Sequence, residues 1–261
     1  MTNSVDECVT ILLDADITAY QFASRGQISY KFGTDPEDVA VEVMHVEDII
    51  PSMVEHIEEL KETLKADRVI VCLSCPSAKG WRRGILPEYK LNRNPAGVPV
   101  LLQELKQYLR ENYETFERPT LEADDVMGIL ATATVIKGRK IIVSIDKDMN
   151  TIPCTLYNPS RGTLVEVSEE DADYYHLTQA LTGDTTDNYK GCPKVGAVGA
   201  AKLLVKGDHK GNWERVVKAF VSKGLTAADA LLQARVARIC RTSEYDFKLK
   251  QVKLWQPPEL E

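Results

Sequence analysis

Three apolar runs along the chain predict buried β-strands. They lie at 9–13, 68–74 and 139–148 and are rich in Val, Ile and Leu. Between them, residues 47–65 and 98–113 carry apolar side chains at helical spacing, which predicts amphipathic helices. Apolar strands that alternate with helices are typical of an α/β fold with a parallel sheet. Ligands bind such sheets at the carboxyl ends of the strands.

The pattern changes after about residue 175. Gly and Pro first interrupt short helical pieces, and residues 212–224 and 226–244 then have helical patterns. We therefore predict an α/β domain over 1–175 and a helical subdomain over 176–255. The last residues, 255–261, read "WQPPELE" and are expected to be a solvated tail.

A further predicted helix starts with an unusual group of acids. Residues 121–130 read "LEADDVMGIL", and we expect the helix to continue to Gly138. Acidic residues favour a helix N-terminus, where Thr120 is a candidate N-cap. That accounts for one or two acids, but three within four positions repel one another. A divalent cation would remove this repulsion.

Other acids stand at the ends of the predicted strands or beside the Gly-rich region. Carboxylate oxygens without His or Cys are ligands that suit Mg²⁺ or Mn²⁺. Two such ions about 4 Å apart could hold the attacking and leaving oxygens of a phosphodiester. The candidate metal ligands are Asp14, Asp16, Glu122, Asp124, Asp125, Asp146, Asp148, Asp184 and Asp187.

The formal net charge of the 261-residue chain is −7, which argues against a nucleic-acid partner only if the acids are spread evenly. Two divalent ions would offset four of these charges. No apolar run approaches the roughly 18 residues of a membrane span, and the polar N-terminus is not a secretory signal. We expect a cytoplasmic protein without a membrane partner. The six cysteines should be reduced, with Cys72 and Cys75 as buried thiols.

Two segments predict contacts with nucleic acid. In "GWRRGILPEYKLNR" (80–93), cations that can neutralise phosphate are interleaved with aromatic rings that can stack on unpaired bases. The alternative is a solvated basic loop, in which Trp and Tyr are less expected. Its candidates are Trp81, Arg82, Arg83, Tyr89, Lys90 and Arg93. Because it lacks apolar periodicity, we expect it to be mobile without substrate. The second segment, "GCPKVGAVGAAKLL" (191–204), is Gly-rich and can bring backbone N–H groups to a phosphate.

These motifs together resemble the 5′-nuclease, or flap endonuclease, superfamily, and especially its small phage and bacterial 5′–3′ exonucleases. The resemblance covers most of residues 10–205. It implies a PIN-like α/β domain, a basic arch around 80–113, and a helix–three-turn–helix element at 191–204. It also implies two Mg²⁺ ions and hydrolysis of DNA or RNA at or near a 5′ end or flap. The matching blocks are "LLDAD", "WRRGILPEYKLNR", "LEADDVMGILA", "SIDKDM" and "GDTTDNYKGCPKVGAVGAAKLL".

The resemblance also implies a role for each matching residue. The acids around the first metal are Asp14, Glu122, Asp124 and Asp125. Those of the second metal are Asp146, Asp148 and Asp187, with Asp184 beside them. Lys90 and Arg82 match basic residues that approach the scissile phosphate, and Tyr89 matches an aromatic that stacks on the terminal base. The duplex-binding hairpin, where K⁺ often binds, comprises Gly191, Val195, Gly196 and Gly199, with Lys202 as a further contact.

One position departs from the family pattern. The family usually has an Asp at the end of the second strand, and here Ser74 falls near that place in "VCLSC". Asp16 is the candidate to compensate. The departure bears on metal affinity and not on the class of reaction.

Three other functions remain open from the residues alone. A PIN-type ribonuclease would share the acids but lack the Gly-rich hairpin, and a non-catalytic structure-specific DNA-binding protein would have lost acids. A phosphatase or other small-molecule hydrolase would not need the basic segment. For the preferred reading, the expected partner is DNA with 5′ ends or flaps, with RNA–DNA hybrids as a further candidate. We expect the protein to be a monomer. Any polymerase or replisome partner would act in trans, as a separate protein.

Overall fold

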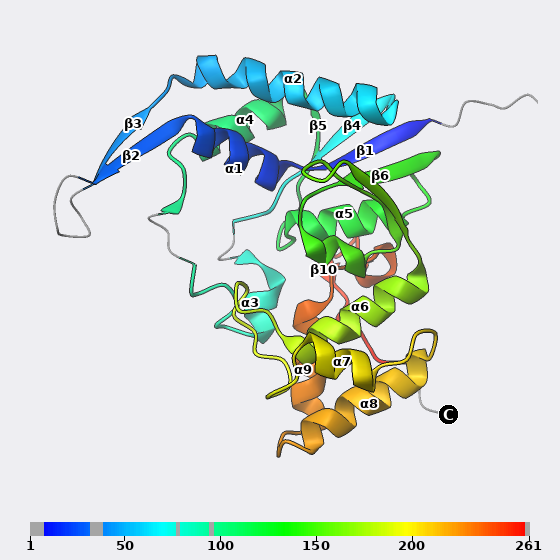
Figure 1. Cartoon of the computed structure of the whole chain (residues 1–261). Helices are drawn as coiled ribbons and strands as arrows, with labels where there is room; N and C mark the ends of the chain where they lie inside the picture. Colours follow the sequence, from blue (N-terminus) through cyan, green and yellow to red (C-terminus); the bar gives the residue numbers. More distant parts are fainter. Residues whose placement is uncertain (1–7, 32–38, 77–78, 94–96, 259–261) are drawn as a thin grey trace, which may run out of the picture.

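A six-stranded sheet forms the centre of the computed structural model, which describes residues 8–31, 39–76, 79–93 and 97–258 (Figure 1). The strand order is β5-β4-β1-β6-β7-β8. Neighbouring strands run parallel, except that β8 is antiparallel to β7. The parallel α/β prediction is therefore confirmed. The strands are β1 (Val9–Asp14), β4 (Arg68–Cys72), β5 (Glu114–Phe116), β6 (Arg139–Val143), β7 (Cys154–Asn158) and β8 (Thr163–Val167).

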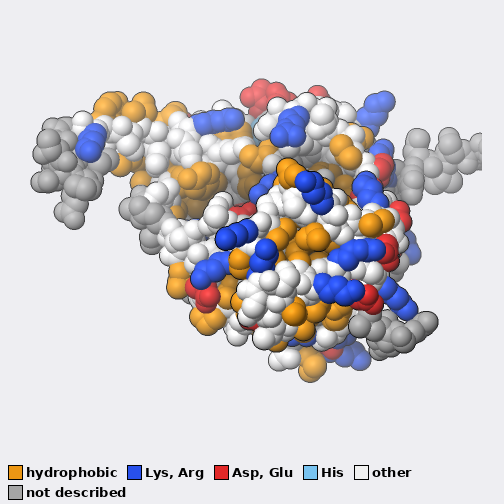
Figure 2. All heavy atoms as spheres, turned by 60° about the horizontal axis from the view of Figure 1, so that its bottom comes forward, with side chains coloured by type: hydrophobic (Ala, Val, Ile, Leu, Met, Phe, Trp, Pro, Cys, Tyr) orange, Lys and Arg blue, Asp and Glu red, His pale blue; other side chains and the backbone are white. Residues whose placement is uncertain are grey.

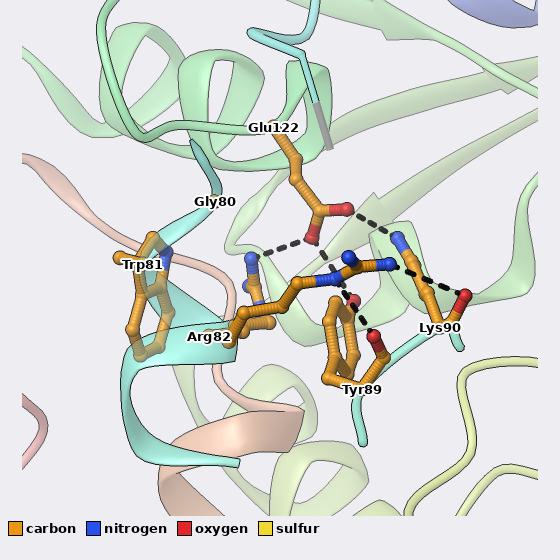
Figure 3. A pocket seen from close by; sticks show the side chains of 7 residues that line it. Gly80, Trp81, Arg82, Tyr89, Lys90 and Glu122 are labelled. Carbon is orange, nitrogen blue, oxygen red and sulfur yellow. Dashed lines mark hydrogen bonds and ion pairs between the residues drawn. The ribbon is translucent and has the colours of Figure 1, made fainter. Parts of the chain in front are cut away.

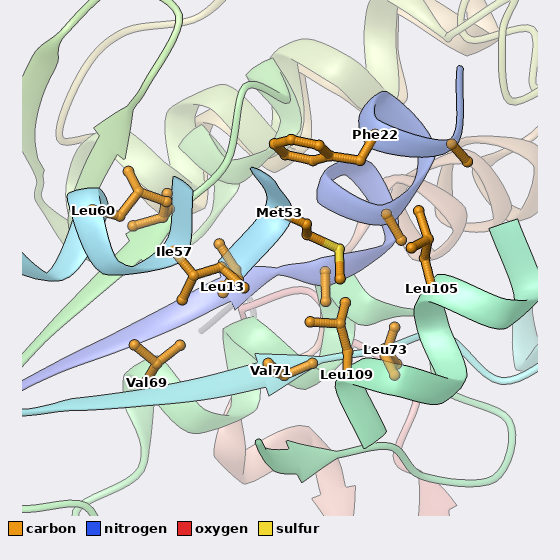
Figure 4. Close-up of a cluster of buried hydrophobic side chains, with 14 of the residues drawn as sticks. Leu13, Phe22, Met53, Ile57, Leu60, Val69, Val71, Leu73, Leu105 and Leu109 are labelled. Carbon is orange, nitrogen blue, oxygen red and sulfur yellow. The ribbon is translucent and has the colours of Figure 1, made fainter. Parts of the chain in front are cut away.

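Alternating side chains of the central strands build a core on each face of the sheet. Leu13 and Val71 lie on the face covered by three helices, where Met53, Leu105 and Leu109 are fully buried (Figure 4). These helices are α1 (Ala15–Arg25), α2 (Val46–Leu64) and α4 (Leu102–Asn112). The second half of the predicted arch is thus a core helix.

The opposite face packs on α5 (Ala123–Thr132) through residues such as Leu12 and Ile142. The helix prediction for 121–138 was too long, because α5 ends at Thr132 and its N-cap is Glu122 rather than Thr120. Gly138 instead precedes β6 with a φ of 84°, where a Cβ would lie 2.0 Å from the carbonyl oxygen of Cys8.

A second group of helices lies below the sheet in Figure 1 and has its own core. It contains α6 (Glu169–Thr182), α7 (Ala197–Leu203), α8 (His209–Val221) and α9 (Ala227–Ala237). The predicted boundary at residue 175 falls inside α6. After α9 the chain returns, and Ile239 and Cys240 pack with α5 under the sheet. The division at 175 therefore does not separate the two cores.

The remaining elements are short. The hairpin of β2 and β3 projects from the body at the left of Figure 1, and none of these elements was predicted apart from the 3₁₀ turn at Thr242–Glu244, which falls inside the helix predicted over 226–244. They are β2 (Gln27–Lys31), β3 (Val39–Val43), α3 (Trp81–Ile85), the 3₁₀ helices η3 (Lys147–Thr151) and η4 (Thr242–Glu244), β9 (Tyr245–Asp246) and β10 (Gln251–Val252).

Three smaller predictions can be compared with the structure. Cys72 and Cys75 are buried free thiols, as expected. The tail prediction was wrong for Trp255, which packs edge-on against His176 and Trp213. Residues 259–261 of that tail lie outside the described residues. Among the described helices, none combines the length and apolar character that crossing a membrane requires.

The close approach of α5 to the returning chain gives a first testable prediction. A Cβ at Gly128 would lie 2.4 Å from the carbonyl oxygen of Cys240 and 3.0 Å from the side chain of Ile239. Although Ala is the better helix former, Gly128→Ala should destabilise the fold by about 2 kcal/mol, or roughly 4–8 °C in Tm. Gly84→Ala in α3, where a Cβ meets nothing within 4 Å, is the matched control and should leave Tm unchanged or slightly raised. A thermal melt in which Gly128→Ala equals or exceeds the wild type would contradict the packing.

Candidate active site

The sheet topology brings the strand-end acids to one edge, as predicted. Strands β1 and β6 are parallel neighbours, and their register pairs Leu13 with Val143. Asp14 at the end of β1 therefore meets the residue that follows β6, and its Oδ2 accepts a 2.7 Å hydrogen bond from the Ser144 hydroxyl. Asp146 and Asp148 continue from there as the N-cap and first turn of η3.

Burial and mutual repulsion raise the pKa values of several of these acids. Burial first, and then Asp16 and Asp146, raise the pKa of Asp14 to about 7. Burial and then Asp146 raise the pKa of Asp148 to about 7. Burial and then Asp14 raise the pKa of Asp124 well above its ordinary value. These carboxylates share a site that disfavours their charged forms.

Four acids lack a cationic partner. In the part of the chain that the structure describes, no Lys or Arg forms an ion pair with Asp14, Asp124, Asp146 or Asp148. We call these residues the four unpaired acids. Their polar contacts include hydrogen bonds from Ser144 to Asp14 and from the Gln179 amide to Asp148, at 2.7 and 2.6 Å.

The other five acids each pair with a Lys or Arg. The pairs are Asp16 with Lys106, Asp184 with Lys147, Asp187 with Arg93 and Lys90, Glu122 with Lys90 and Arg82, and Asp125 with Arg82. Within the described ranges, no three His, Cys, Asp or Glu side chains already converge as a metal site. The structure thus holds five of the nine predicted acids in ion pairs and leaves four without a cationic partner.

Arg82 and Asp125 occupy places other than those predicted. Asp125 is fully buried, and both of its oxygens accept hydrogen bonds from the Arg82 guanidinium at 2.8 Å. Arg82 also donates to Glu122 at 2.8 Å and to the carbonyls of Val236 and Arg238 at 3.0 and 2.7 Å. With every N–H group engaged and only 3% of the residue exposed, Arg82 cannot reach a phosphate in this structure. The pair forms part of the core.

The aromatic residues of the basic segment also face inward. The indole of Trp81 donates a 2.9 Å hydrogen bond to Asp125 and packs against the core around α5. Tyr89 is 5% exposed, and its hydroxyl lies 2.8 Å from Asp187 and 3.0 Å from Glu122. The Lys90 ammonium lies 4.9 Å from the centre of the Tyr89 ring. The Tyr89 ring is therefore not open for base stacking here, contrary to the expectation, whereas Trp81 is half-buried with the Arg82 guanidinium over its ring.

Lys90 and Glu122 form the charged centre of a small pocket (Figure 3). Burial alone would raise the pKa of Glu122, but Lys90 and then Arg82 outweigh it and hold this pKa at about 2. Burial alone would lower the pKa of Lys90, yet Glu122 and Asp187 raise it above its ordinary value. The pair therefore stays ionised, and Lys90 lies within 3.6 Å of Asp187 as well.

The basic segment is docked on the turn that precedes the Gly-rich region. The backbone amide of Lys90 donates to the Asp187 carbonyl at 2.9 Å. The side-chain amide of Asn92 donates to the Thr185 carbonyl, and that of Asn188 donates to the Glu88 carbonyl, each at 2.7 Å. These contacts are polar and long-range, which apolar periodicity does not register, and mobility of the segment without substrate stays a prediction.

Ser74, which falls near the place where the resemblance implied a carboxylate, caps the start of α5. Its hydroxyl accepts a 2.8 Å hydrogen bond from the Ala123 amide at the start of α5. Its own amide donates to Asp16 at 3.3 Å, so Asp16 lies next to this position. Asp16 is also paired with Lys106 at 2.7 Å, a cation from α4 that sequence reasoning missed. Ser144 and Gln179 were missed too, although Ser144 stands inside the "SIDKDM" block.

The predicted hairpin residues divide into buried and exposed ones. Gly191 is buried with a φ of 63°, and a Cβ there would lie 2.3 Å from the Gly183 amide, so it serves a close chain crossing. Gly196 is exposed and is the N-cap of α7, whereas Val195 and Gly199 are half-buried. Figure 2 shows Lys and Arg side chains on the face that this helical group presents. Among the lysines around the Gly-rich segment, Lys190, Lys194 and Lys202 are exposed.

Comparison with known proteins settles the family. The model of the family described as "5′-3′ exonuclease, N-terminal resolvase-like domain" matches residues 12–182. The chain belongs to this family. It is 27% identical to the exonuclease of Escherichia phage T7, over 97% of this chain and 95% of that protein. It is 29% identical to the 5′–3′ exonuclease of Buchnera aphidicola from Acyrthosiphon pisum, over 78% and 80% of the two chains.

A solved structure supports the fold. The flap endonuclease of bacteriophage T5 superposes with a TM-score of 0.63 over 88% of each chain, at 16% identity. The chain therefore has a PIN-like fold and belongs to a family of 5′-nucleases, as the sequence predicted.

The raised pKa of Asp14 gives a prediction for metal-free protein. Because its folded pKa of about 7 lies above its ordinary value of 3.8, the native state binds the proton more tightly than the unfolded state. Asp14 therefore lowers stability as pH rises from about 4 to about 7. In EDTA, Asp14→Asn should raise the free energy of unfolding by up to about 4 kcal/mol at pH 8, and by little near pH 4.

Denaturant unfolding at several pH values measures this difference. Glu117→Gln is the control, because Glu117 pairs with Arg110 and is not one of the charges that raise the pKa of Asp14, so its replacement should give no such gain. An Asp14→Asn protein that is less stable than the wild type at pH 8 would show that burial of this carboxylate carries no penalty.

Proposed function

We propose that this 5′-nuclease hydrolyses phosphodiester bonds at or near 5′ ends and flaps of DNA, with two Mg²⁺ ions for which Mn²⁺ can substitute. The observation that carries the proposal is the group of four unpaired acids beside the Lys90–Glu122 pair. Asp14 is buried and the other three are half-buried, and carboxylates that lack cations fit divalent ions, which prefer hard oxygen ligands. Relatives named as exonucleases and a structure of the T5 enzyme "with DNA and metal ions" support this choice.

Each group at this edge has a proposed task. Asp14, Asp124, Asp146 and Asp148 would hold the ions, with Glu122 and Asp187 beside them. The ions would supply charge that stabilises the attacking and leaving oxygens. Lys90, whose ammonium stays protonated, would face negative charge that develops on the phosphate. Arg93, whose side chain is 55% exposed, would anchor a phosphate farther from the reacting bond.

The face around α7 is proposed to hold the duplex part of the substrate. Gly196 and Gly199 allow a backbone to come close, and Lys190, Lys194 and Lys202 are exposed beside them. A K⁺ ion at this turn is part of the proposal. We further propose a monomer that acts in the cytoplasm, with a polymerase or replisome in trans and RNA–DNA hybrids as a second substrate.

Cleavage of a 5′-labelled flap DNA tests the function. The protein should cut near the base of the flap and at recessed 5′ ends in Mg²⁺ and should be inactive in EDTA. Single-stranded RNA of the same sequence should be cut far more slowly. Preference for the RNA would favour a ribonuclease, and tight flap binding without cleavage in Mg²⁺ or Mn²⁺ would favour a non-catalytic DNA-binding protein.

The acids after β6 give the next prediction. Asp146→Asn and Asp148→Asn should abolish cleavage, because each removes a carboxylate proposed to hold an ion. Both variants should still bind flap DNA, since loss of a negative charge does not weaken attraction to phosphate. Rates at saturating DNA and affinities in Ca²⁺ measure the two effects. Full activity of either variant at physiological Mg²⁺ would refute the role of that acid.

Lys90 and Arg93 should separate chemistry from binding. Lys90→Ala should lower single-turnover cleavage about 10²-fold, the scale of one lost preorganised electrostatic group, with a small loss of affinity. Arg93→Ala should weaken binding and leave the saturated rate near normal. Lys79→Ala removes an exposed cation of the same region and is the control for net charge. If Lys90→Ala cleaves at the wild-type rate when saturated, Lys90 is only an anchor.

A further inference from the structure

The backbone of Lys90 is held in an uncommon conformation. Its φ is 56°, in the left-handed region that a residue with a Cβ seldom adopts. A residue keeps such a conformation only when its surroundings fix it. Lys90 is also 8% exposed, and its ammonium meets Glu122 and Asp187, which belong to separate parts of the chain. A fixed backbone is therefore what directs this ammonium.

Four hydrogen bonds fix that backbone. One is donated by the Lys90 amide to the Asp187 carbonyl at 2.9 Å, and another by the Arg93 amide to the Lys90 carbonyl at 3.4 Å. The other two come from one side chain, because Arg83 donates through Nε to the Tyr89 carbonyl at 3.1 Å and through Nη2 to the Lys90 carbonyl at 3.5 Å. Arg83 thus bonds the carbonyl oxygens on both sides of the Lys90 N–Cα–C unit.

We propose that Arg83 is a positioning residue that sets the direction of the Lys90 ammonium. The planar guanidinium offers two donors in a rigid fork, so it can bridge consecutive carbonyls in a way that a single ammonium cannot. Displacement of a reacting group by about 1 Å can cost about 10²-fold in rate. The part of this inference that concerns cleavage rests on the proposed function, whereas the part that concerns the position of Lys90 does not.

The competing role for Arg83 is the one its sequence context suggested, a contact to phosphate. The structure argues against it, since the same guanidinium nitrogens already donate to the backbone and the residue is half-buried. The two roles predict different results. A phosphate contact acts through charge, so Lys should largely replace Arg, and loss should weaken binding and reduce its salt dependence. A backbone clamp acts through geometry.

The experiment compares full-length Arg83→Ala, Arg83→Lys and Lys79→Ala with the wild type. The first readout is acetylation of Lys90 by trace acetic anhydride, measured by mass spectrometry relative to the exposed Lys137. The second is single-turnover cleavage of flap DNA at saturating enzyme in Mg²⁺. The third is flap affinity in Ca²⁺ at several salt concentrations. Circular dichroism confirms that each variant is folded.

We expect Lys90 to be labelled several-fold faster in Arg83→Ala, because an unclamped backbone exposes the ammonium. Cleavage should fall about 10-fold, with affinity and its salt dependence unchanged. Arg83→Lys should show both defects in reduced form and still bind normally, which keeps the test valid if the Ala variant fails to fold. Lys79→Ala should match the wild type in labelling and rate.

Two results would overturn the proposal. One is unchanged labelling of Lys90 in both Arg83 variants. The other is weaker, less salt-dependent binding in Arg83→Ala that Arg83→Lys restores, which would make Arg83 a phosphate contact. Absence of cleavage by the wild type would refute the proposed function, while the labelling would still decide the role of Arg83.

Discussion

Repulsion among carboxylates at one edge of the sheet is the constraint on which the arrangement of the rest of this site depends. Parallel strands β1 and β6 and the start of α5 bring their acids together whatever the charge, because the apolar cores fix those elements. Ion pairs neutralise five of the acids. The four unpaired acids remain, and the pKa values of Asp14 and Asp148 are raised to about 7. The fold stores an unfavourable interaction that a divalent ion would relieve.

The cations that neutralise the site also organise it. Arg82 joins α3 to α5 through Asp125, and to the C-terminal end of α9 through the carbonyls of Val236 and Arg238. A buried ion pair of this kind is weak evidence for stability, since desolvation offsets much of the attraction. Its consequence here is geometric, because the same guanidinium donates to one oxygen of the Glu122 carboxylate while Lys90 contacts the other. The helical group and the acid edge thereby share one hydrogen-bond network.

The sequence predicted the parts of this arrangement that depend on local pattern. Apolar runs located the central strands, and strand ends located Asp14, Asp146 and Asp148. The resemblance added Lys90 and the family. Burial of Arg82 could not be predicted, since its partners Val236 and Arg238 lie 154 and 156 residues away. In sequence, Arg82, Arg83 and Arg93 look alike, and only tertiary contacts separate a core residue, a backbone clamp and an exposed cation.

The burial of Tyr89 and of Asp125 could not be predicted from the sequence for the same reason. Each stands in a motif that resembles a substrate or metal contact, and each is held inside by long-range hydrogen bonds. Ser74 shows the converse, because a polar residue at a strand end became a cap for α5 instead of a ligand.

Proton release on metal binding tests the central claim most directly. If the four unpaired acids take up Mg²⁺, protons held by Asp14 and Asp148 must leave, since a carboxylate binds the ion in its deprotonated form. Titration calorimetry in buffers of different ionisation enthalpy counts those protons. With the pKa values of Asp14 and Asp148 at about 7 and that of Asp124 also raised, we predict release of at least about one proton per protein at pH 7, and less as the pH rises further. Mg²⁺ binding without proton release at pH 7, or with release that does not vary with pH, would contradict the account.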